Sequence, residues 1–156
     1  MSTTRISRHI KAPRAAVYRA LLDASAVEKW RVPPGMTSNV HTFEPREGGA
    51  FRVSLTYVEP TATGKTTAHT DTYHGRFVAL VPDEKIVESL EFETDDPALQ
   101  GEMTITTTLV DADEGGTDLH AIHEGLPPGV PPTDNATGWR ESLARLAALV
   151  ESGAAT

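Results

Sequence analysis

Hydrophobic and polar residues alternate along most of the chain, a pattern typical of half-buried β-strands. Turn-forming residues interrupt the alternation, as in Glu47–Gly49 and Asp113–Gly116, and predict hairpins between neighbouring strands. The predicted strands cover residues 4–12, 40–43, 51–57, 67–81, 86–93, 103–109 and 117–124. So many consecutive strands predict an antiparallel sheet with one apolar face.

Two short helices are predicted between the first two strands. Pro13 fits the first position of a helix, because an N–H at that position would have no partner within the helix, and residues 14–22 follow with a helical pattern. Asp23 can then cap a second helix over residues 24–30.

A longer helix is predicted near the C-terminus, after the proline-rich segment 127–132. Thr133 or Asp134 can cap this helix, which runs to about Glu151 and is ended by Gly153. Its apolar stripe consists of Trp139, Leu143, Leu146 and Val150.

This order of elements predicts an α+β fold. The apolar face of the sheet needs a cover, and the terminal helix is the one predicted element long enough to provide it. We therefore expect a curved antiparallel sheet wrapped around this helix, with the two short helices closing one end and a cavity left inside. A single domain is expected over residues 1–156, with an ordered core from about 4 to 152.

Composition narrows the classes of function. A net charge of −8, with scattered Lys and Arg residues, disfavours nucleic acid and anionic membranes as partners. The chain contains no cysteine and no long apolar run, which excludes thiolate metal sites and predicts no transmembrane helix. The first residues lack a signal-peptide pattern, so the cytoplasm is the expected compartment. No cofactor is expected.

Three polar side chains fall on the apolar side of the predicted strands, namely Tyr57, Glu88 and His123. A buried carboxylate is costly unless it is paired, so these positions predict a wet or ligand-filled cavity. In the alternative interpretation, Glu88 reaches solvent near a strand end and His123 bonds a loop carbonyl. The candidate ligand-binding residues are Trp30, Phe51, Val53, Leu55, Tyr57, Glu88, Leu90, Phe92, Met103, Ile105, Thr107, His123, Trp139 and Leu143.

The fourth predicted strand does not fit a single parity. Tyr73 and Phe77 share one face, whereas Val78 and Leu80 share the other. A β-bulge near Gly75 would reconcile the two halves.

No catalytic or metal-binding motif emerges from the residue spacing. His69, Asp71 and His74 do not share one strand face, so no metal site is expected there. Ser54 lies on the outward parity, and no serine has the glycine pattern of a nucleophile elbow. No catalytic residue is assigned.

Short motifs in a fixed order from about residue 4 to 152 resemble those of the SRPBCC (START-like) superfamily. Within it, the chain resembles bacterial proteins similar to the activator of heat-shock-protein-90 ATPase. The motifs include Ile10–Pro13, Arg46–Gly49, Leu80–Ile86, His123–Pro127 and Gly138–Leu143. The resemblance implies the helix-grip fold of the birch pollen allergen, with a hydrophobic cavity between sheet and helix. The superfamily includes lipid carriers, hormone receptors, aromatic cyclases and co-chaperones, so it implies no single activity.

We therefore expect a protein that binds a small hydrophobic or aromatic ligand between the sheet and the terminal helix. One alternative is an enzyme of the cyclase or hydratase kind, with Glu88 and His123 as general base and acid. A second alternative, suggested by the resemblance, is an interaction protein that acts on a chaperone ATPase. A homodimer is compatible with each of these functions.

Overall fold

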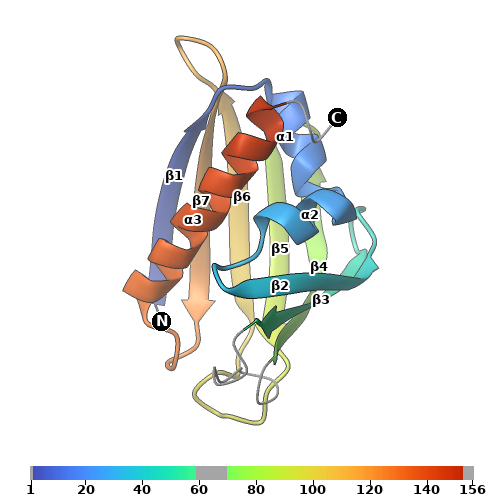
Figure 1. Ribbon diagram of the computed structural model, residues 1–156, viewed down its shortest axis with the longest axis vertical. Helices are drawn as coiled ribbons and strands as arrows, with labels where there is room; N and C mark the ends of the chain where they lie inside the picture. Colours follow the sequence, from blue (N-terminus) through green and yellow to red (C-terminus); the bar gives the residue numbers. More distant parts are fainter. Residues whose placement is uncertain (1, 59–69, 153–156) are drawn as a thin grey trace.

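Seven antiparallel strands form one curved sheet, and a long helix lies along its concave side (Figure 1). The computed structural model describes residues 2–58 and 70–152. Within these ranges the strands are ordered β1-β7-β6-β5-β4-β3-β2 across the sheet. The elements are β1 (Ser2–Ile10), α1 (Arg14–Leu21), α2 (Ala24–Trp30), β2 (Met36–Phe43), β3 (Ala50–Tyr57), β4 (Thr70–Val81), β5 (Lys85–Phe92), β6 (Met103–Asp111), β7 (Thr117–Leu126) and α3 (Pro132–Glu151).

This arrangement confirms the predicted α+β helix-grip fold, although several boundaries differ. β1 ends at Ile10 rather than at residue 12, and β7 continues to Leu126. β2 begins at Met36, four residues before the predicted start. The sequence did not predict this first half of the strand, because it is mostly polar and shows no alternation of polar and apolar residues. We predicted the start of a strand at residues 67–69 and the end of a helix at Gly153, and these residues lie outside the described ranges.

The predicted cap of α2 by Asp23 is confirmed, whereas the predicted cap of α3 by Thr133 or Asp134 is wrong. Asp23 Oδ1 accepts hydrogen bonds from the backbone N–H groups of Ser25 and Ala26, at 2.9 and 3.3 Å. In α3, by contrast, Pro131 is the N-cap residue and the helix already begins at Pro132, with no side-chain cap. Proline suits these positions because its fixed φ matches the first helical turn. Asp134 instead lies in that first turn.

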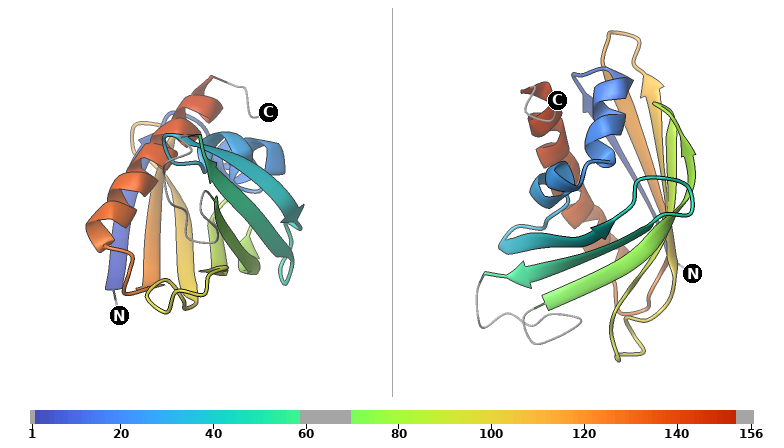
Figure 2. Two further views of the ribbon diagram at one scale, coloured as in Figure 1. Left: turned by 60° about the horizontal axis from the view of Figure 1, so that its bottom comes forward. Right: turned by 90° about the vertical axis from the view of Figure 1, so that its right-hand side faces the viewer.

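The long helix covers one side of the concave face. α3 runs along β1, whereas the β2–β3 hairpin curls over from the opposite edge of the sheet to meet α2 (Figure 2). Buried residues form two clusters, one beneath α1, α2 and α3 and one among the aromatic residues of β3 and β4. Trp139 packs against both clusters and therefore joins them.

The bulge in β4 lies three residues beyond its predicted position. Pairing with β5 shifts between Phe77 and Ala79, which leaves Val78 as the extra residue, and Val78 is 49% exposed. After this shift Leu80 returns to the inner face and packs against the aromatic cluster. The predicted bulge in this strand is therefore confirmed, but it lies at Val78 instead of near Gly75.

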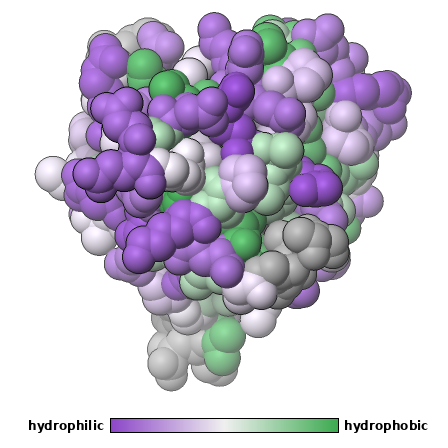
Figure 3. All heavy atoms as spheres, turned by 90° about the horizontal axis from the view of Figure 1, so that it is seen from above, coloured by the Kyte–Doolittle hydropathy of each residue, from purple (hydrophilic) through white to green (hydrophobic). Residues whose placement is uncertain are grey.

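The surface fits the high net charge of the chain. The face in Figure 3 is largely hydrophilic, with hydrophobic side chains in small patches. Within residues 2–58 and 70–152, no helix has the length and apolar character needed to cross a bilayer.

Gly75 is required for close packing. A Cβ atom at this position would lie 2.1 Å from the carbonyl oxygen of Ser89 and 2.8 Å from the ring of Phe51. We expect Gly75→Ala to lower the free energy of unfolding by roughly 1–3 kcal/mol, the usual cost of overpacking. Urea denaturation monitored by circular dichroism measures this loss, and an unchanged midpoint would contradict the packing argument.

Candidate functional site

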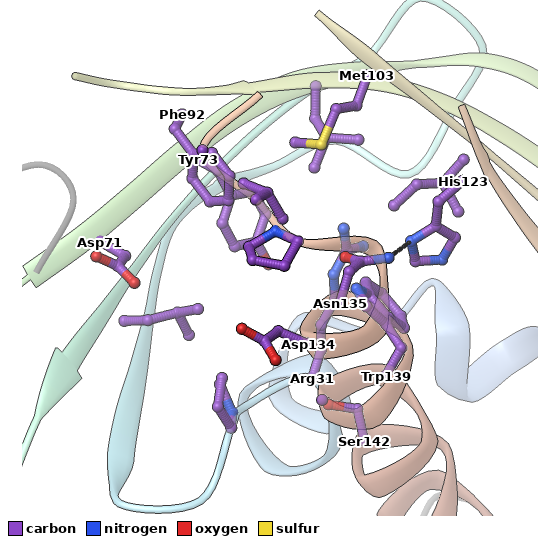
Figure 4. Close-up of a pocket in the computed structure, with 18 residues that line it drawn as sticks. Arg31, Asp71, Tyr73, Phe92, Met103, His123, Asp134, Asn135, Trp139 and Ser142 are labelled. Carbon is purple, nitrogen blue, oxygen red and sulfur yellow. Dashed lines mark hydrogen bonds between the residues drawn. The ribbon is translucent and has the colours of Figure 1, made fainter. Parts of the chain in front are cut away.

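A pocket of about 380 Å³ lies between the first half of α3, the inner face of the sheet and the segment after α2 (Figure 4). Its volume falls at the lower end of the range usual for small-molecule sites, roughly 300–1,000 Å³. The lining residues are Arg31, Pro33, Leu55, Asp71, Tyr73, Leu90, Phe92, Met103, Ile105, His123, Gly129, Val130, Pro131, Asp134, Asn135, Gly138, Trp139 and Ser142.

Half of the candidate residues predicted from the sequence line this pocket. Those on the wall are Leu55, Leu90, Phe92, Met103, Ile105, His123 and Trp139. Those outside the lining are Trp30, Phe51, Val53, Tyr57, Glu88, Thr107 and Leu143. All of this second group except half-buried Tyr57 are buried. The alternation of apolar residues therefore identified the side chains on the inner face of the sheet. It did not distinguish those that line the cavity from those packed in the core.

Five of the remaining lining residues were missed for two reasons. Tyr73 and Asp71 lie on the inner face of β4, where the misplaced bulge obscured the parity. Asn135, Gly138 and Ser142 recur at helical spacing beside the apolar stripe of α3. That second stripe of small and polar residues was a readable signal.

Arg31 and Glu88 form a buried ion pair beside the pocket. Arg31 Nη2 lies 2.8 Å from Glu88 Oε1, and the two side chains are 13% and 8% exposed. The guanidinium carbon also lies 4.9, 5.1 and 5.9 Å from the ring centres of Trp139, Tyr73 and Phe51. Burial lowers the pKa of Arg31 and the Glu88 carboxylate raises it, with a net upward shift. Glu88 thus fits neither interpretation from the sequence, because its carboxylate neither reaches solvent nor lines the cavity. It forms an ion pair with Arg31 instead.

The position of Arg31 follows from contacts at both ends of its segment. Its backbone N–H donates to the Val27 carbonyl, closing the last turn of α2, where a cation is favourable to the helix dipole. Arg145 of α3 donates to the carbonyl of Val32 and holds the following residue against the helix. The guanidinium is thereby directed between α3 and the sheet.

His123 is a buried, neutral imidazole in the pocket wall. Asn135 Nδ2 donates to His123 Nδ1 at 3.2 Å, which leaves the imidazole proton on Nε2. Burial, together with the nearby charge of Arg31, lowers the pKa of His123 from 6.5 to about 4. The ring also meets Trp139 edge to face, with ring centres 4.7 Å apart. The predicted hydrogen bond between His123 and a loop carbonyl is therefore not formed, and His123 bonds the side-chain amide of Asn135 on α3 instead.

Two buried polar atoms of the pocket wall have no hydrogen-bond partner within the described residues. They are Tyr73 Oη and His123 Nε2, on side chains that are 4% and 1% exposed. Burial raises the pKa of Tyr73, so its hydroxyl keeps its proton at neutral pH. Both groups can donate a hydrogen bond, and leaving such a group buried and unbonded costs roughly 1–3 kcal/mol.

The geometry does not assemble the acid–base pair of the enzyme alternative. Glu88 pairs with Ile105, and Ile105 with His123, so the two candidates lie two strands apart in one row. Adjacent strands are about 4.8 Å apart, which separates the two backbones by about 10 Å. The carboxylate of Glu88 is moreover occupied by Arg31.

The histidines considered for a metal are also separated. Asp71 lines the pocket, whereas His74 lies on the opposite face of the sheet, between Glu91 and Glu93 at 3.1 and 3.0 Å. His69 lies outside the described residues. Within residues 2–58 and 70–152, no group of three or more His, Asp or Glu side chains could hold a metal ion.

Comparison with known proteins places this architecture in a family. The family model described as "Activator of Hsp90 ATPase homolog 1-like protein" matches residues 11–151. The chain belongs to this family. No curated protein matches it.

Solved structures of proteins from three organisms are similar to this chain. A crystal structure of a protein from Chromobacterium violaceum is similar, with 37% identity, 96% of each chain covered and a TM-score of 0.84. A protein from Rhodobacter sphaeroides shares 22% identity over 97% of this chain and 93% of its own, with a TM-score of 0.80. A third, from Silicibacter pomeroyi, shares 16% identity over 97% and 99%, with a TM-score of 0.78. The last two similarities concern the fold alone.

The buried ion pair predicts strong coupling between its two members. Arg31→Met and Glu88→Leu should each lower the free energy of unfolding by roughly 3–5 kcal/mol, because each leaves one buried charge without its partner. The double variant should recover most of that loss, since no charge then remains. Urea denaturation of the four proteins at pH 7 measures the coupling. Additive losses would show that the pair is not coupled.

The lowered pKa of His123 predicts a pH-dependent stability. The folded pKa, about 4, lies below the unfolded value of 6.5, so the unfolded chain takes up the proton first as the pH falls. The wild-type protein should therefore lose about 3 kcal/mol between pH 6.5 and 4, relative to His123→Gln. Denaturation at several pH values tests this difference, and parallel profiles would contradict it.

Proposed function

We propose that this protein binds a small, mostly apolar molecule in the pocket between α3 and the sheet. The observation that carries the proposal is a mostly apolar cavity of about 380 Å³ whose lining includes Tyr73 and His123, each with a buried donor that has no hydrogen-bond partner within the described residues. A few polar groups in an apolar, concave site are the usual design of small-molecule pockets, because they fix the orientation of the ligand. A ligand that accepts hydrogen bonds would remove the cost of leaving these donors unbonded.

Gly138 supports the same conclusion from the side of the helix. It lies inside α3 and lines the pocket, yet a Cβ atom there would meet nothing within 4 Å. Glycine in a helix interior is less stable than alanine by roughly 0.5–1 kcal/mol. Close packing of the fold therefore does not require this glycine, whereas open space in the pocket does explain it.

The proposal is tested by filling the pocket from position 138. The uncharged dye N-phenyl-1-naphthylamine, which fluoresces in apolar surroundings, should bind the wild-type protein with a saturable signal. Gly138→Leu should weaken this binding at least about tenfold, because the new side chain occupies the space of the ligand. The matched control Gly138→Ala should bind within about twofold of wild type and gain roughly 0.5–1 kcal/mol in stability.

Two results would contradict the proposal. One is the absence of saturable dye binding by the folded wild-type protein, and the other is equal binding by a folded Gly138→Leu variant. Native mass spectrometry of the protein purified from its own cells then provides the mass of the natural ligand.

A further inference from the structure

We propose that the pocket selects uncharged ligands with a hydrogen-bond acceptor, such as an amide or ketone oxygen, over carboxylates of the same shape. This inference rests on the proposed function, because it concerns the chemistry of the molecule bound in that pocket. It follows from how the charges around the cavity are already paired.

Arg31 provides no free positive charge to a ligand. Among the described residues that line the pocket, it is the one permanent cation, and Glu88 lies 2.8 Å from it. Both members of the pair are nearly buried, so solvent screens their attraction weakly. A carboxylate entering the pocket would meet a neutral pair instead of a cation, and its desolvation would cost several kcal/mol.

The rest of the described lining contains no further cation. It adds the carboxylate of Asp134, at the start of α3 (Figure 4). The start of α3 also faces the cavity, and the dipole of a helix favours anions at this end. Asp134 occupies the first turn and already supplies that negative charge.

The unbonded groups of the wall are uncharged donors. The imidazole of His123 is neutral at pH 7 and carries its proton on Nε2, while Tyr73 keeps its hydroxyl proton. An amide or ketone oxygen can accept from such donors without bringing a charge into the cavity. The desolvation of a neutral amide is far less costly than that of a carboxylate.

The test compares two molecules of equal shape, 2-naphthamide and 2-naphthoate, by calorimetric titration at pH 7.5. 2-Naphthamide should bind the wild-type protein at least about tenfold more tightly. Tyr73→Phe should weaken 2-naphthamide about fivefold, the contribution of one neutral hydrogen bond, and leave N-phenyl-1-naphthylamine unaffected.

A variant of the ion pair tests the cause of the preference. Glu88→Gln removes the counter-charge of Arg31 and should shift the ratio of the two affinities toward 2-naphthoate by at least about tenfold. The double variant Arg31→Met/Glu88→Leu removes both charges and should keep the wild-type preference. If Glu88→Gln does not fold, the wild-type ratio and the double variant still decide the proposal.

The outcomes distinguish a failure of the charge preference from a failure of the proposed ligand binding. Equal or tighter binding of 2-naphthoate by the wild-type protein would overturn the charge preference and leave the proposed function intact. An unchanged ratio in folded Glu88→Gln would overturn the role of the ion pair. If neither naphthalene compound nor the dye binds, the proposed function itself is contradicted.

Discussion

One helix cannot cover a seven-stranded sheet, and the rest of this structure depends on that constraint. Seven strands at about 4.8 Å spacing span about 30 Å, whereas a helix with its side chains is about 10–12 Å wide. α3 lies along β1, so the concave face near β3, β4 and β5 must be filled in another way. Aromatic side chains fill part of that space, and the remainder is the pocket. The cavity is thus a consequence of the geometry of the fold.

Most of the fold and seven of the residues that line the pocket could be predicted from the sequence, because both follow from local periodicity. Alternation identified the inner faces of β3, β5, β6 and β7 without knowledge of their partners. Alternation is not continuous in β4, where the extra residue Val78 reverses the parity within one strand. A bulge is defined by the register with a neighbouring strand, so local alternation could not place it.

The buried position of Arg31 could not be predicted from local alternation. It follows the last residue of α2, and nothing in the adjacent sequence indicates that its guanidinium is buried. Its partner Glu88 lies on the central strand β5, and the aromatic rings around it belong to β3, β4 and α3. The polar residue on the inner face was correctly seen as costly, but the compensating charge came from a loop distant in the sequence. Only the tertiary structure joins the two.

Trp139 has a consequence of a different kind. The chain contains two tryptophans, and the ring of Trp139 lies on the pocket wall, 6.0 Å from Trp30 and in contact with both His123 and Arg31. Indole emission responds to the polarity and charge of its immediate surroundings. Trp139 is therefore an intrinsic fluorescent probe of the cavity. The wavelength and intensity of its emission should change when a molecule enters the cavity, without any attached label.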